Sequence, residues 1–278
     1  MTILHLNLLL AATRAHGPFG LPPALVPLAF LVLASLLLRL TPYVLAPIAL
    51  YRMSPQHLNP KLRLVAANEL LDPEVRAYIE ASEQALARAG FIAPERITTQ
   101  TELQLTGVET LLENPDAGDL ANVVALLNKA ANAPERLITC VTFRSALADG
   151  TTVITSNTTA VGYWPVEPTK CTVNLPDVRD PITMYRLHRA RMAQLSASAA
   201  QEKLTRGATP EQRLAFATRQ WLDSTNYLIK VGYRKRSPSG IRNTALGATF
   251  TAWRRMFPWK QLLEQQRRRA TAEVMRLA

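Results

Sequence analysis

The feature that most constrains this chain is a long apolar run near its N-terminus. From Leu21 to Tyr51 the sequence carries a single charged residue, Arg39. A helix that spans the hydrocarbon core of a bilayer needs about 20 apolar residues, each rising about 1.5 Å. The core helix of a soluble protein rarely runs for so long without charges. The sequence therefore predicts a transmembrane or interfacial anchor over residues 21–51, preceded by a short segment over residues 1–20.

Arg39 indicates where the span ends. A charge at the bilayer centre costs about 2.5–3.5 kcal/mol, whereas an arginine at the end of a span extends to the headgroups at little cost. We therefore predict a span over residues 22–38 that ends near Arg39. Pro42 and Pro47 then shape a short interfacial segment. Whether residues 40–51 lie at the interface or insert into the bilayer stays open.

The charges that flank the run predict its orientation. Arg14 is the one cation that precedes it, whereas Arg52, Lys61 and Arg63 follow closely. Cytoplasmic flanks are enriched in Lys and Arg. A cleaved signal peptide fits less well, because its positive region should come first. We expect a single-pass protein of the inner membrane whose C-terminal domain faces the cytoplasm.

Most of the net charge lies near the C-terminus. Of a formal net charge of +11, a balance of +10 comes from residues 230–278. A cationic segment of this kind is typical of chains that meet an anionic surface, and a solvated helical face is the alternative. Aromatic rings alternate with cations here, which suits lipid headgroups. The predicted membrane-surface residues are Arg39, Trp253, Arg254, Arg255, Trp259 and Lys260. A helix that binds a partner or packs on the protein itself is the alternative for this segment.

Three helices begin with marked caps. Asp72 precedes Pro73, Asp180 precedes Pro181, and Thr209 precedes Pro210. A capping side chain followed by proline at the first helical position favours a helix start. Apolar residues then recur at helical spacing, so the first helix should pack on a sheet.

β-Branched residues predict strands between these helices. Residues 107–127 are interpreted as two strands around a turn at residues 114–118, with a helix over Leu120–Leu127 as the alternative. Asp149-Gly150 suits a tight type I′ hairpin turn. A last strand over residues 170–175 completes what we expect to be an antiparallel meander.

The C-terminal part continues with a basic linker over residues 234–243 and two helices separated at Pro258. The predicted fold class is therefore α+β: an N-terminal transmembrane helix, an antiparallel β-meander packed with helices over residues 60–230, and a basic helical tail over residues 231–278.

The sequence lacks the common catalytic and phosphate-binding motifs. It contains no GxGxxG, Walker A, GxSxG, HExxH or CxxC pattern. The candidate binding residues are Thr155, Asn157 and His188, and His188 is also the one catalytic candidate. Outward-facing strand hydroxyls and a buried structural histidine are the plainer interpretations. No cofactor and no metal site is expected.

Cys140 and Cys171 each lie in a strand-like run, where a small buried hydrophobe is the favoured interpretation. One disulfide between them is the alternative in an oxidising compartment.

Three short segments carry a resemblance. They are FRSALADGTTVITSN ending at Asn157, LPDVRDPITMYRLH ending at His188, and GATFTAW ending at Trp253. In this order they resemble a loose group of uncharacterised bacterial membrane-anchored proteins. The resemblance implies a bacterial membrane protein and no active site.

Two hypotheses of function follow. The first is a membrane-anchored binding or scaffold protein, without enzymatic activity, whose partners are the lipid bilayer, anionic headgroups and a protein. The second is a small-ligand sensor or enzyme with a pocket between the β-meander and the His188 helix. Nucleic-acid binding by the basic tail is disfavoured, because no recognition motif accompanies it.

Overall fold

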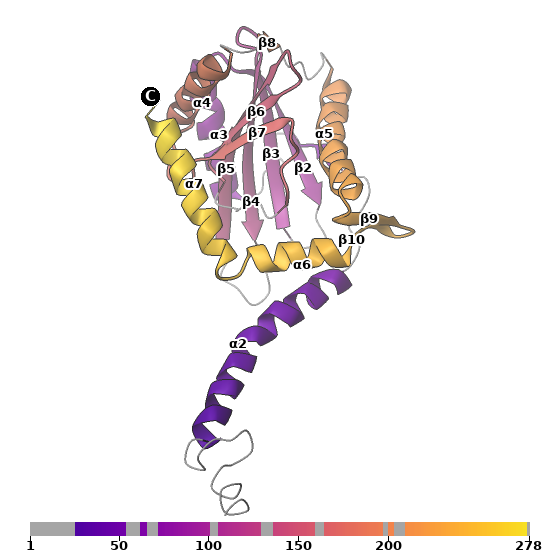
Figure 1. The fold of residues 1–278 in the computed structure, drawn as a ribbon. Coiled ribbons are helices and arrows are strands. Elements are labelled where there is room, and N and C mark those ends of the chain that lie inside the picture. The colour runs from indigo at the N-terminus through magenta and orange to yellow at the C-terminus, as the bar shows by residue number, and fades with distance from the viewer. Residues whose placement is uncertain are drawn as a thin grey trace, which may run out of the picture.

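In the computed structural model, one apolar helix stands apart from a mixed α+β body (Figure 1). The predicted N-terminal segment over residues 1–20 lies outside the described part of the chain. The structure describes residues 26–53, 62–65, 72–100, 105–128, 136–158, 164–196, 200–202 and 209–276.

Helix α2 (Val26–Arg52) contains the apolar run. Its stretch Pro27–Arg52 is long and apolar enough to cross a membrane, and its most apolar part is not buried against the body. The helix continues past Arg39 through Pro42 and Pro47, so the segment predicted to lie at the interface belongs to the same helix. The end of the membrane span near Arg39 stays a prediction. Each proline removes one backbone hydrogen bond, and an apolar helix tolerates this loss where a neighbouring group satisfies the freed carbonyl.

A mostly antiparallel sheet forms the centre of the body. Its strands follow the order β1-β2-β3-β4-β5-β6-β7, and the short β8 pairs with β5. The strands are β1 (Leu62–Leu64), β2 (Ile92–Gln100), β3 (Leu105–Asn114), β4 (Asp119–Asn128), β5 (Arg136–Leu147), β6 (Thr152–Ser156), β7 (Lys170–Asn174) and β8 (Gln201–Glu202).

Strands β1 to β6 pair in antiparallel fashion as predicted, whereas the pairing of the last strand differs from the prediction. β3 and β4 confirm the two-strand interpretation, so the helical alternative for Leu120–Leu127 is wrong. β7 runs parallel to β6, and the antiparallel assignment of this last strand is therefore wrong. The long connection after β6 allows this, because parallel strands need a crossover that a tight turn cannot provide.

The β5–β6 turn is one residue longer than predicted. The Leu147 N–H donates to Thr151 O at 2.8 Å, which leaves three residues in the loop. Gly150 takes the left-handed conformation with φ +83°. A three-residue loop that ends in a left-handed residue is a common hairpin connection, second to the two-residue turns.

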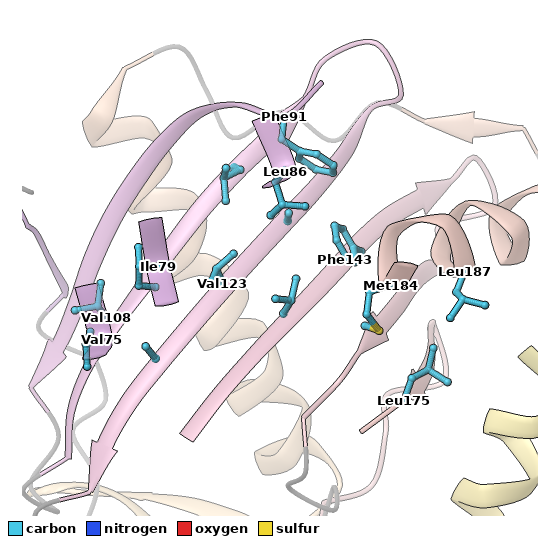
Figure 2. Close-up of a cluster of buried hydrophobic side chains, with 14 of the residues drawn as sticks. Val75, Ile79, Leu86, Phe91, Val108, Val123, Phe143, Leu175, Met184 and Leu187 are labelled. Atoms are coloured by element: carbon cyan, nitrogen blue, oxygen red, sulfur yellow. The ribbon is translucent and has the colours of Figure 1, made fainter. Parts of the chain in front are cut away.

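Helices α3 (Pro73–Arg88) and α4 (Pro181–Leu195) cover one face of the sheet and enclose the core (Figure 2). The predicted caps are confirmed, since Asp72 accepts from two backbone N–H groups and Asp180 accepts from one. Ile79 and Leu86 of α3 meet Phe91 and Phe143 from the sheet. The α3 face therefore packs on the sheet as predicted.

The remaining elements form the side and the lower rim of the body in Figure 1. They are α5 (Pro210–Lys230), β9 (Arg234–Ser237), β10 (Gly240–Asn243), α6 (Ala245–Arg254) and α7 (Trp259–Met275). The predicted linker over residues 234–243 is wrong, because β9 and β10 pair as a hairpin. Two helices separated at Pro258 are confirmed. The end of α7 packs on the body, where Val274 is buried and Thr271 Oγ1 donates to Asn174 O at 3.2 Å.

Candidate functional site

Two of the three predicted binding residues meet inside the body. Thr155 on β6 and His188 on α4 are fully buried, and Thr155 Oγ1 lies 2.9 Å from His188 Nδ1. Asn157 lies apart from this contact. Its Oδ1 accepts from the Val141 N–H at 2.6 Å, and its Nδ2 donates to Val178 O at 3.0 Å. Asn157 therefore joins β5 to the segment before α4 and does not contact the histidine.

The histidine belongs to a chain of buried hydrogen bonds between two charges. Arg191 Nη1 donates to Thr155 Oγ1 at 2.6 Å, and at the other end Ser145 Oγ donates to Asp119. Ser145 Oγ lies 2.8 Å from His188 Nε2. Arginine only donates and a carboxylate only accepts, so the Thr155 hydroxyl donates to Nδ1, and Ser145 accepts from Nε2–H. His188 is thus held as the neutral Nε2–H tautomer.

Burial sets the charge state of this histidine. Burial, together with the smaller effect of the cations Arg191 and Arg189, lowers the pKa of His188 to about 3. A general acid or base needs a pKa near the pH at which it works, and it needs access to a reacting group. Both ring nitrogens are occupied and the ring has no exposed surface. The arrangement links β5, β6 and α4 and offers no proton to a ligand.

Asp119 lies at the far end of this series of hydrogen bonds, and no sequence motif pointed to its role. Tyr185 donates to it at 3.0 Å, Arg189 at 3.1 Å and Gln201 at 2.8 Å. The carboxylate has no exposed surface and compensates its burial with these bonds. Its position directly after the turn at Gly118 makes it look like a turn residue. The partners come from α4 and β8, which only the tertiary fold brings together.

Both cysteines are free thiols, so the alternative of a disulfide between them is wrong. Burial raises the pKa of Cys140 to about 11. The Cys171 sulfur lies 3.4 Å from Arg191 Nη2. Among the described residues, no group of three or more His, Cys, Asp or Glu side chains is placed to hold a metal ion.

A second candidate site lies where α2 meets α6. The carbonyl of Tyr43 loses its usual donor because Pro47 has no N–H, and Trp253 Nε1 donates to it at 3.0 Å. The Tyr43 hydroxyl in turn donates to Phe257 O. The four half-buried residues in the second half of α2 share one face, at spacings of three and four: Tyr43, Ala46, Pro47 and Leu50.

Helix α6 is the element that α2 contacts most (Figure 1). The buried face of α6 consists of Gly247, Ala248, Thr251 and Ala252, and Gly247 lies against the backbone of Tyr233. α2 is thus attached to the body through α6, and its first half extends away from the body.

Large apolar side chains are exposed around this attachment. In and between α6 and the start of α7 they are Leu246, Trp253, Phe257, Trp259 and Leu262. Of the predicted surface cations, Arg255 and Lys260 are exposed, whereas Arg254 is half-buried against the Phe250 ring, 4.9 Å from its centroid. Arg39 is exposed midway along α2. The predicted surface residues outside α2 thus cluster on the rim nearest to α2.

No family model, no curated protein and no solved structure matches this chain. The two sites described above are therefore the basis on which function is argued. One is closed and structural, and the other is exposed and lies beside an apolar helix.

Proposed function

We propose that this protein is a membrane-anchored binding protein whose body rests on the lipid surface. The observation that carries the proposal is the exposed aromatic rim of α6 and α7 directly beside the attachment of α2. Isolated exposed apolar residues are ordinary, but a cluster of them rimmed by cations marks an interaction surface. Trp side chains and cations together favour the headgroup region of a bilayer.

The contact between α2 and α6 supports a particular depth of α2 in the bilayer. With α2 wholly inside the bilayer, Arg39 would lie near its centre at a cost of about 2.5–3.5 kcal/mol. Residues 40–52 instead have their half-buried face on α6, which leaves them beneath the body and close to the surface. Arg39 then lies where the apolar span meets the headgroups. Residues 26–38 are the described part of the apolar span.

The flanking charges support the cytoplasmic leaflet of an inner membrane as the surface concerned. That leaflet is anionic, so cations at the rim add to the attraction of the apolar side chains. In this arrangement the body is presented close to the bilayer in one orientation, which suits a scaffold for a protein partner.

The alternative function, an enzyme or ligand sensor that uses His188, finds no support in the contacts of that residue. Its ring is enclosed by Ser145, Thr155 and Phe143, all fully buried. A substrate would have to displace the bonds that hold α4 on the sheet.

Depth-dependent fluorescence quenching tests the proposal. Full-length variants that keep one tryptophan, either Trp259 on the rim or Trp221 within α5, are reconstituted in vesicles that contain lipids brominated near the headgroup. We expect strong quenching of Trp259 and little of Trp221, because α5 flanks the sheet away from the rim (Figure 1). Equal quenching of the two, or none of Trp259, would refute membrane docking through this rim.

A further inference from the structure

A basic pocket lies at the point where α2 ends. Its volume is about 430 Å³, and it is formed by the last residues of α2 and by the β9–β10 hairpin. Four of the lining side chains are cations, all exposed: Arg52, Lys235, Arg236 and Arg242. Ser237 and Asn243 add polar groups. None of the described residues that line the pocket is a carboxylate, so these residues place four positive charges in one concave site.

These cations lack acidic partners in the part of the chain that the structure describes. The ion pairs recorded there join Arg96 to Glu83, Lys170 to Glu167 and Arg189 to Asp119. Arg236 donates instead to a neutral amide, Asn226 Oδ1, at 3.1 Å. Four close cations without a counter-charge repel one another and attract an anion.

The hairpin register places two like charges opposite each other. Lys235 on β9 pairs directly with Arg242 on β10. Like charges in a directly opposed antiparallel pair are destabilising. Lys235 also lies over the Tyr51 ring, 5.9 Å from its centroid, which draws it towards the end of α2. An anion between Lys235 and Arg242 would convert this repulsion into attraction.

The end of α2 does not oppose an anion at this place. A helix C-terminus carries partial negative charge on its free carbonyls. Here Asn243 Nδ2 donates to the Leu50 carbonyl at 3.2 Å, and Arg52 supplies a cation in the last turn. Both groups offset the partial negative charge of the helix end. The pocket lies at the end of α2 that is attached to the body, which membrane docking would place at the level of the headgroups.

We propose that this pocket binds the headgroup of an anionic phospholipid that carries two phosphate groups; the proposal rests on the membrane docking proposed above. The charge count favours two phosphates, because a headgroup with one phosphodiester leaves three of the four cations without a counter-charge. A basic pocket beside a spanning helix on the cytoplasmic side is the usual site for such headgroups. Phosphate oxygens suit the planar donors of Arg52 and Arg242.

Native mass spectrometry of the full-length protein in neutral detergent tests this proposal. Cardiolipin, with two phosphates, and phosphatidylglycerol, with one, are added in equal phosphate amounts. We expect one retained cardiolipin and little phosphatidylglycerol. The variant Lys235→Ala/Arg242→Ala should bind cardiolipin about thirtyfold more weakly, the loss expected when two cations at a lipid surface are removed. The matched control, Arg268→Ala/Arg269→Ala in α7, removes the same charge outside the pocket and should bind like the unchanged protein.

Three outcomes would overturn the proposal. They are equal retention of the two lipids, equal losses in the two double variants, and displacement of cardiolipin by excess inorganic phosphate, which would identify a free-phosphate site. Trp259 quenching separates this proposal from the proposed function. Normal quenching without cardiolipin retention would reject the pocket and leave docking in place, whereas retained cardiolipin with an unquenched Trp259 would reject docking through the rim.

Discussion

Acidification should destabilise this protein through one buried histidine, His188. The ordinary pKa of histidine is 6.5, and burial lowers that of His188 to about 3. Below pH 6.5 the unfolded chain takes up a proton on this side chain, whereas the folded protein cannot until the pH falls to about 3. The stabilising contribution of neutral His188 is therefore complete above pH 6.5 and is lost as the pH falls towards 3.

The expected size of this effect follows from proton linkage. One extra proton bound by the unfolded state lowers the free energy of unfolding by about 1.4 kcal/mol per pH unit. At pH 6.5 half of the unfolded chains already carry this proton, so between pH 6.5 and about pH 4.5 the loss is about 2 kcal/mol, or roughly thirtyfold in the folding equilibrium. A domain of this size has a stability of about 5–15 kcal/mol, so the loss is easily measured.

The assay is urea unfolding of the full-length protein in detergent, followed by tryptophan fluorescence across this pH range. The control is His188→Gln, because the amide can accept from Thr155 and donate to Ser145 without titrating. Carboxylates titrate alike in both proteins, so the difference between their pH slopes isolates the histidine. Parallel slopes for the two proteins would refute the burial argument.

Three further predictions concern the packing of the body. Gly247→Ala should destabilise by several kcal/mol in thermal unfolding, because the new methyl group would overlap the backbone carbonyl oxygen of Tyr233. Cys140, whose pKa is raised to about 11 by burial, should react with iodoacetamide only after unfolding, as measured by mass spectrometry. Trp253→Phe should cost about 0.5–1.5 kcal/mol by removing the hydrogen bond to the Tyr43 carbonyl, and clearly less in a Pro47→Ala background, where the backbone N–H is restored.

The series of buried hydrogen bonds that contains His188 stabilises the fold and does not form an accessible reactive centre. It joins a buried cation, Arg191, to a buried anion, Asp119, through three neutral groups. Such a network is stabilising only when every member is satisfied. Replacement of one member leaves its neighbours buried without a partner, so the fold depends on all of these residues together.

The helix starts and the apolar anchor were open to prediction, because their signals are local. Asp72 and Asp180 each precede a proline, and the cap is formed within three residues of chain. The length of the apolar run likewise follows from composition. The direction of β7 and the pairing of residues 234–243 had no such signal, since both depend on which strand lies alongside.

Some features of the candidate sites likewise follow from the local sequence, and others depend on the tertiary structure. Composition alone predicts the aromatic and cationic character of α6 and α7, and Thr155 and His188 were both among the candidate binding residues. The partners of Asp119 and the basic pocket at the end of α2 join residues far apart in the chain, such as Arg52 and Arg242. Sequence determined which helices form and which segment suits lipid, because propensity, capping and hydropathy act over a few residues. Only the tertiary structure decided which charges meet, because burial and distance between remote segments set their electrostatic energy.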